Sequence, residues 1–157
     1  MDHASGHGSP QKGAYWSLGF QTIVSGVIMY LVMFAMIDRL DSFYNNLNML
    51  YMTLMMVAPM MALMVLAMRR MFPSKTVNVA LIAASLIAFF GSFALIRTQT
   101  TIGDTEFLRS MIPHHSGAIL MCREARLSDP EVVRLCKSIE QSQRQEIDEM
   151  KAILARR

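Results

Sequence analysis

The chain has 157 residues, 53% of them hydrophobic, and a formal net charge of +3. This apolar fraction exceeds the roughly 45–50% of ordinary soluble proteins. The charge is mild and no run of Lys or Arg forms a basic patch, so a nucleic-acid partner is excluded. We therefore expect a protein that resides in a lipid bilayer.

The N-terminal residues 1–17 begin with MDHASGHGSP, which is rich in glycine and serine. Such a composition is typical of a flexible segment, and we expect a disordered cytoplasmic tail. His3 and His7 are four residues apart and would bind a metal weakly if ordered, although most tails of this kind have no specific ligand.

Three uncharged stretches, 18–37, 47–68 and 77–96, are predicted to be transmembrane helices. Each has about 20 residues, and about 20 residues rising 1.5 Å each cover a hydrocarbon core of about 30 Å. We therefore expect a three-span membrane domain over residues 18–96. Pro59 lies inside the second stretch, where neighbouring helices can tolerate a kink.

The loop 69–76 indicates the orientation, because it holds Arg69, Arg70 and Lys75 and no acidic residue. Short loops rich in Lys and Arg stay in the cytoplasm. The N-terminus is then cytoplasmic, and residues 97–157 lie on the outer side of the membrane.

Methionine is unusually frequent, with 16 residues. In the second span it recurs at every fourth position, at Met52, Met56, Met60, Met64 and Met68. Stacked thioethers could bind or pass Cu(I). Methionine is also a flexible apolar filler, and for the span alone we favour that interpretation.

Residues 97–157 are predicted to form a helical hairpin with helices 104–127 and 130–155. The second helix has Ser128 or Asp129 as its N-cap and Pro130 at its first position. A connection of two or three residues makes the helices antiparallel. Because about 50 residues bury little core, we expect the hairpin to pack on the membrane domain or to pair with a second copy, giving a homodimeric four-helix bundle.

The apolar periodicity predicts which residues of the two helices face each other. The expected inner face of the first helix carries Phe107, Met111, His114, His115, Ala118, Met121, Cys122 and Ala125. The expected face of the second helix carries Val132, Val133, Cys136, Ile139, Gln143, Ile147, Met150 and Leu154. A turn near residue 129 then places Cys122 opposite Cys136, His115 opposite Gln143 and Met111 opposite Ile147.

This face gathers imidazole, thioether, carboxylate and thiol groups. Soft sulfur donors suit Cu(I) and, by extension, Ag(I), whereas imidazole suits copper in both oxidation states and zinc. The candidate metal ligands are Met111, His114, His115, Met121 and Met150, followed by Cys122, Cys136, Gln143 and Glu146. The alternative is that these side chains only pack, since a single histidine on a helix face is usually no ligand.

Cys122 and Cys136 have three interpretations: a disulfide, a thiolate pair for a soft metal, or two buried small residues. The sequence leaves all three open.

Two segments, FLRSMIPHHSGAILMC and CKSIEQSQRQEIDEMKAIL, resemble the family called domain of unknown function 305. The matching positions are Asp104, Phe107, Met111, His114, His115, Ala118, Met121, Ile139, Gln143, Glu146, Ile147 and Met150. The front of the chain resembles the membrane segment that precedes this domain in a bacterial subgroup. The resemblance implies a ferritin-like helical bundle, and members of the family include periplasmic copper-binding proteins tied to copper tolerance.

We therefore expect an all-α protein: three transmembrane helices followed by an antiparallel hairpin of the ferritin-like, four-helix-bundle type. The expected function is capture of copper, as Cu(I), or of silver ions for tolerance or delivery, at the periplasmic face of a bacterial inner membrane and without catalysis. A second hypothesis is a structural or regulatory membrane module that dimerises or binds a partner through the hairpin.

A third hypothesis, a ferritin-like di-iron enzyme, is weaker. Such sites use Glu-x-x-His motifs, and no glutamate lies three residues before His114 or His115.

Overall fold

The computed structural model describes residues 10–157, which form five α-helices, two short 3-10 helices and no strand. The chain divides into two compact units. The membrane unit comprises the residues up to Met29 together with Tyr51–Arg97, and the hairpin unit comprises Tyr30–Leu50 and Thr98–Arg157. The all-helical prediction is confirmed for the described residues.

The membrane unit contains most of α1 (Pro10–Val32), most of α2 (Leu47–Ala67) and nearly all of α3 (Lys75–Thr98). By length and composition, three helical stretches are able to cross a bilayer: Gly13–Met36, Leu47–Ala67 and Lys75–Thr98. The predicted spans are confirmed at this level.

The first helix starts earlier than predicted. The composition predicts a disordered tail through residue 17, but α1 begins at Pro10 and includes residues 10–17. Proline is favourable in the first turn of a helix, because its missing N–H would have no partner there. His3 and His7 lie outside the described residues.

The methionines of α2 are divided between the surface and the interior of the membrane unit. Met52 and Met56 are 47% and 43% exposed, and Met68, just after the helix, is 41% exposed. Met61 and Met64 are partly buried and pack against the apolar core of this unit. The exposed thioethers are suited to contact lipid, which favours the apolar-filler interpretation of the methionine series.

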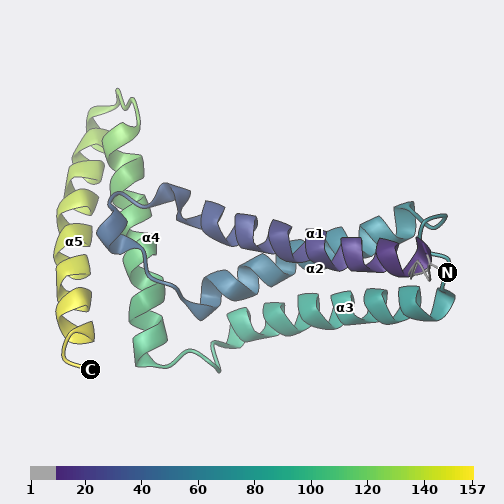
Figure 1. The fold of residues 1–157 in the computed structure, drawn as a ribbon. Coiled ribbons are helices and arrows are strands. Elements are labelled where there is room, and N and C mark those ends of the chain that lie inside the picture. The colour runs from purple at the N-terminus through teal and green to yellow at the C-terminus, as the bar shows by residue number, and fades with distance from the viewer. Residues whose placement is uncertain (1–9) are drawn as a thin grey trace, which may run out of the picture. The chain divides into compact units, whose positions relative to one another are not determined.

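The hairpin unit is built on α4 (Asp104–Glu124) and α5 (Pro130–Leu154), which run side by side and antiparallel (Figure 1). Asp129 is the N-cap of α5, since its Oδ1 accepts hydrogen bonds from the backbone N–H groups of Glu131 at 2.7 Å and Val132 at 3.2 Å. The connection is longer than predicted, because α4 ends at Glu124 and not near residue 127.

The connection between α1 and α2 also belongs to the hairpin unit. It contains the 3-10 helices η1 (Met33–Met36) and η2 (Leu40–Ser42), and both contact α4. The segment lies against α4 at Gly117, where an added Cβ would be in ordinary van der Waals contact, 3.5 Å from the carbonyl oxygen of Met36. The compact units thus divide the chain differently from the predicted domains 18–96 and 97–157.

The buried face of α4 differs from the predicted one. The apolar core of the hairpin unit consists of Leu108, Ile112, Ile119, Ile147 and Met150. The periodicity predicts Phe107 and Met121 on the inner face, but they are 52% and 53% exposed. Because α4 is covered by α5 and also by the α1–α2 connection, its buried face is wider and is turned away from these two residues.

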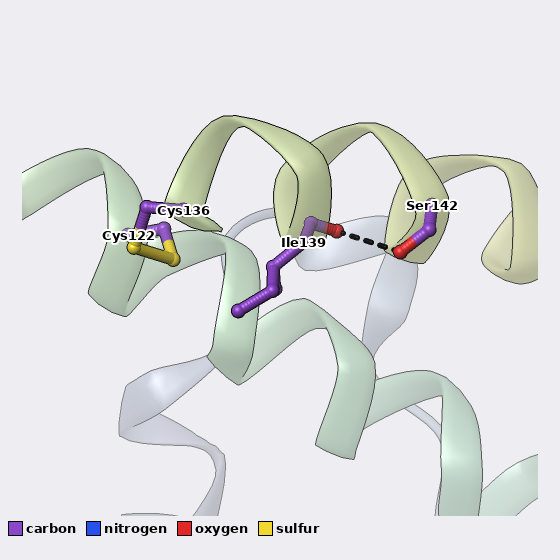
Figure 2. Close-up of a disulfide and its surroundings, with 4 residues drawn as sticks. All are labelled: Cys122, Cys136, Ile139 and Ser142. Atoms are coloured by element: carbon purple, nitrogen blue, oxygen red, sulfur yellow. Dashed lines mark hydrogen bonds between the residues drawn. A yellow bond between two sulfur atoms is a disulfide. The ribbon is translucent and has the colours of Figure 1, made fainter. Parts of the chain in front are cut away.

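A disulfide joins the helices near the α4–α5 turn. Cys122 and Cys136 are bonded through their sulfur atoms, and their Cα atoms are 5.2 Å apart (Figure 2). The predicted pairing of these two positions is confirmed. Of the three interpretations of the cysteines, the structure contains the disulfide, and in this state neither sulfur is a thiolate that could bind a metal.

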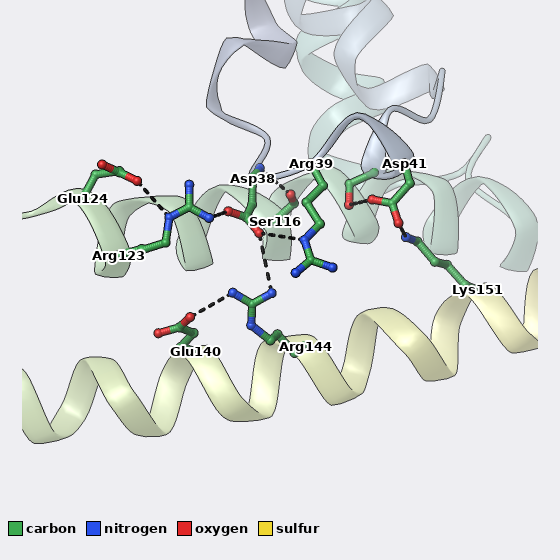
Figure 3. Close-up of polar contacts among 10 residues, drawn as sticks. Asp38, Arg39, Asp41, Ser116, Arg123, Glu124, Glu140, Arg144 and Lys151 are labelled. Atoms are coloured by element: carbon green, nitrogen blue, oxygen red, sulfur yellow. Dashed lines mark hydrogen bonds and ion pairs between the residues drawn. The ribbon is translucent and has the colours of Figure 1, made fainter.

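A buried carboxylate connects the α1–α2 connection to both helices of the hairpin. The side chain of Asp38 is 3% exposed and forms ion pairs with Arg123 of α4 and with Arg144 of α5, whose Nη1 lies at 3.6 Å (Figure 3). The backbone N–H of Asp38 donates to Oγ of the fully buried Ser116 at 2.7 Å.

A second ion pair lies nearby in the hairpin unit. Nζ of Lys151 is 2.8 Å from Oδ2 of Asp41, and this contact lowers the pKa of the Asp41 carboxyl group below its usual range (Figure 3). The α1–α2 connection is therefore attached to α5 at two points, Asp38 and Asp41.

Removing the disulfide is expected to destabilise the hairpin. The bond closes a loop with a sequence separation of 14 residues, and a loop of about 15 residues corresponds to about 3 kcal/mol. In the full chain in detergent, a Cys122→Ser/Cys136→Ser variant should lose amide hydrogen-exchange protection at the end of α4 and the start of α5. A reductant should reproduce this loss in the parent chain and change nothing in the variant; equal protection with and without reductant contradicts the prediction.

Neutralising Asp38 is expected to release the connection from the hairpin. An Asp38→Asn change removes the charge that pairs with Arg39, Arg123 and Arg144 and should weaken the attachment of the connection to both helices. Hydrogen exchange should then rise in η1, η2 and the middle of α4, while α1–α3 are unaffected. Asp148→Asn, an exposed acid of α5, is the matched control. If the two variants exchange alike, Asp38 does not hold the segment.

Candidate metal site in the helical hairpin

His115 is the most buried of the predicted ligands that carry a nitrogen donor, with 9% of its surface exposed. It lies two residues after Pro113, inside α4. Its Nδ1 is 3.0 Å from Oε2 of Glu146 on α5. This contact is an ion pair only when the imidazole is protonated, and Nδ1 has no hydrogen-bond partner among the described residues.

Gln143 supplies a second buried polar atom without a partner. Its Oε1 is inaccessible to water and receives no hydrogen bond from any described residue. Gln143 and Glu146 are three residues apart and therefore neighbours on α5. An unpaired buried acceptor costs about 1–3 kcal/mol, so the hairpin has two polar atoms that a bound cation or a water molecule would stabilise.

The pKa of the His115 imidazole is lowered from its ordinary value. Burial is the main cause, because it disfavours the charged ring; the Glu146 carboxylate opposes this shift and the neighbouring His114 adds to it. His115 is thus neutral at pH 7, which is the form that binds metal ions.

His114 is exposed and lies beside His115, with ring centroids 5.8 Å apart and an angle of 57° between the planes. The two imidazoles therefore face different surroundings, one water and one the hairpin interior. Met111 precedes His115 by one helical turn and is partly buried against the apolar core.

The remaining predicted ligands lie in environments that differ from that of His115. Met150 is 8% exposed and belongs to the apolar core, where its side chain packs against other hydrophobic residues. Met121 is 53% exposed. Cys122 and Cys136 are bonded to each other. Three predicted ligands consequently remain at the α4–α5 interface. His115 and Gln143 have buried polar atoms, and the Glu146 carboxylate lies close to the His115 imidazole.

Residues 10–157 contain no group of three His, Cys, Asp or Glu side chains placed to hold a metal ion. His115 and Glu146 give one nitrogen and one carboxylate. Any ion bound between them requires further donors, for which the chain offers the Gln143 amide oxygen and the Met111 thioether.

Sequence reasoning missed Asp38 and Ser116, which attach the α1–α2 connection to this part of α4. A signal was present: in a three-span topology, the first loop and the C-terminal region emerge on the same side of the membrane. An acidic residue directly after the first span could therefore have been matched with the arginines of the hairpin.

The lowered pKa of His115 predicts a pH-dependent stability. Between the folded-state pKa and about 6.5, the unfolded chain binds more protons than the folded chain, so stability is full above about pH 6.5 and decreases as the pH falls below it. Hydrogen exchange of the hairpin, measured with a chelator present at pH 7.5 and 5.5, should show this loss.

The matched variants for this test are His115→Asn, which should flatten the pH dependence, and His114→Asn, which should retain it. A nuclear magnetic resonance titration that places the His115 midpoint above 6.5 contradicts the prediction.

Comparisons with known proteins identify relatives of the chain. It is 38% identical over 115 residues to "Uncharacterized protein L153" of Acanthamoeba polyphaga mimivirus, a match that covers 71% of this chain and 73% of that protein. No solved structure matches it. The model of the family "Domain of unknown function (DUF305)" matches residues 93–154, which include α4 and α5. The chain belongs to the DUF305 family.

Proposed function

We propose that this protein is a membrane-anchored metal-binding protein whose hairpin unit captures copper, as Cu(I), or silver ions. The observation that carries this proposal is the pair of buried atoms without partners, Nδ1 of His115 and Oε1 of Gln143. The Glu146 carboxylate, 3.0 Å from the same imidazole nitrogen, would balance the charge of a bound cation.

The donor chemistry favours copper over hard cations. Imidazole suits copper in both oxidation states, and the thioether of Met111, one turn before His115, suits Cu(I) and Ag(I). Magnesium and calcium prefer shells made of oxygen atoms, which this group does not supply. We assign His115, Glu146, Gln143 and Met111 to the ion and place His114 at the exposed edge, where it would receive the ion from solvent.

The disulfide supports a location outside the cytoplasm, because disulfides persist in oxidising compartments. The basic loop with Arg69, Arg70 and Lys75 supports a cytoplasmic α2–α3 connection. We therefore place the hairpin in the periplasm and the N-terminus in the cytoplasm, with a bacterial inner membrane as the membrane that the family resemblance implies. Capture there would limit toxicity or allow delivery.

Metal titration of the full chain in nanodiscs tests the proposal. The probes are Cu(I) against a competing chromophoric chelator, Ag(I), Cu(II) and Zn(II). The background carries His3→Ala/His7→Ala so that the N-terminal histidines do not contribute. We expect micromolar or tighter binding of Cu(I) and Ag(I), and at least a tenfold loss in His115→Ala and in Glu146→Gln, since about 1.4 kcal/mol corresponds to tenfold.

Methionine variants provide matched controls within the same hairpin. Met111→Leu removes a proposed thioether ligand with little change in volume and should weaken Cu(I) binding. Met150→Leu alters a buried core residue in the same way and should leave the affinity unchanged. Equal effects of the two substitutions, or unaltered binding in His115→Ala, contradict the assignment.

A second candidate function is the structural module that pairs through its hairpin. Phe107, His114 and Met121 recur at seven-residue steps on α4 and are all exposed. Seven residues are nearly two turns, so the three share one face that a second copy could cover to form a four-helix homodimer. Failure of the full chain to bind any of the four ions would favour this function.

A further inference from the structure

An open cavity of about 640 Å³ lies in the hairpin unit, apart from the candidate metal site. The α1–α2 connection, the first turns of α4 and the last turns of α5 contribute to its wall. Three cationic side chains line it: Arg109, Lys151 and Arg157. No Asp or Glu of the described chain is among its lining residues.

Each of these cations has a carboxylate partner that does not line the cavity. Glu106 lies 3.2 Å from Arg109, and Asp104 lies 2.8 Å from Arg157, with the Asp104 side chain 74% exposed. Lys151 is paired with Asp41, as described above. Pairs exposed to this degree contribute only about 0–1 kcal/mol. An arginine has five N–H donors and a lysine three, so donors remain for a ligand in the cavity.

The cavity also has apolar walls, formed in part by Phe43 and Leu154. Phe43 is 40% exposed and packs against Phe34, with ring centroids 4.0 Å apart and the ring planes tilted by 34°. The amide of Asn45 adds a neutral polar group. This combination of cations, an amide and apolar surface fits an amphiphilic anion better than a bare inorganic ion.

The chain positions of the lining residues suggest where this ligand comes from. Phe43 lies between the candidate span that ends at Met36 and the one that begins at Leu47. Arg109 follows the third candidate span, which ends at Thr98. In a three-span topology, the end of the first span, the start of the second and the end of the third all emerge on one side of the bilayer.

We propose that this cavity binds the phosphate group of an anionic phospholipid. The guanidinium groups of Arg109 and Arg157 bind the phosphate oxygens, to which planar bidentate donors are matched, and Lys151 adds a point charge. Phe43 and Leu154 contact the carbon atoms beside the phosphate ester. The shared chemistry of the ligand is a phosphate ester, whose source is either a lipid headgroup or a soluble phosphate compound.

The test uses the full chain in a neutral detergent with a metal chelator present. Binding of short-chain phosphatidylglycerol, short-chain phosphatidylcholine, glycerol phosphate and inorganic phosphate is measured by native mass spectrometry and calorimetry. We expect saturable binding of phosphatidylglycerol and much weaker binding of phosphatidylcholine. An Arg109→Gln/Arg157→Gln variant should bind phosphatidylglycerol about twenty-fivefold more weakly, at about fivefold for each cation near a lipid surface.

The matched control is Arg126→Gln/Arg134→Gln, which removes the same charge from two exposed positions of the hairpin unit outside the cavity wall. Circular dichroism verifies that both variants retain their helices. Binding of phosphatidylglycerol alone supports a lipid source, and equal binding of glycerol phosphate supports a soluble source for the same site. Equal losses in the two double variants, or no saturable binding of any phosphate compound, overturn the proposal.

Discussion

The register of α4 against α5 is the constraint on which the candidate metal site depends. The Cys122–Cys136 disulfide fixes it at the end near the turn, and the apolar contacts of Ile112 and Ile119 with Ile147 and Met150 hold it along the helices. A shift of one turn moves a residue by about 5.4 Å, which would separate the His115 imidazole from the Glu146 carboxylate. The disulfide and the apolar core therefore set the positions of the His115 imidazole and the Glu146 carboxylate. The contact between these two groups is a consequence of the register and does not determine it.

The α1–α2 connection supplies what a two-helix hairpin lacks. Two helices can bury only one face of each other, and α4 has a second face made of Ser116 and Gly117 that is covered by the connection. Asp38 brings a carboxylate to arginines of both helices, so that its burial is compensated by opposite charge. A three-span topology places the α1–α2 connection and the residues after α3 on the same side of the membrane. These are the segments that form the hairpin unit.

Elements that depend on local periodicity were predicted well from the sequence. The three apolar stretches, the Asp129 cap and the pairing of Cys122 with Cys136 follow from composition, capping chemistry and the short turn. The inner face of α4 was predicted poorly at Phe107 and Met121, because periodicity assumes a single covering partner. The position of His115 opposite Gln143 stays a prediction, and the structure adds a contact that it did not include: Nδ1 of His115 lies 3.0 Å from Oε2 of Glu146, three residues beyond Gln143 on α5.

The disulfide and the unpaired polar atoms have opposing energetic effects of similar size. Two buried polar atoms without partners, Nδ1 of His115 and Oε1 of Gln143, cost about 1–3 kcal/mol each, and a hairpin of about 50 residues has little apolar core to offset that cost. A covalent loop closure of about 3 kcal/mol is of the same order. The hairpin can therefore retain a neutral, buried imidazole beside an unpaired amide oxygen and remain folded. A bound cation would then stabilise a site that the two helices already form, so binding would need no folding of the helices around the ion.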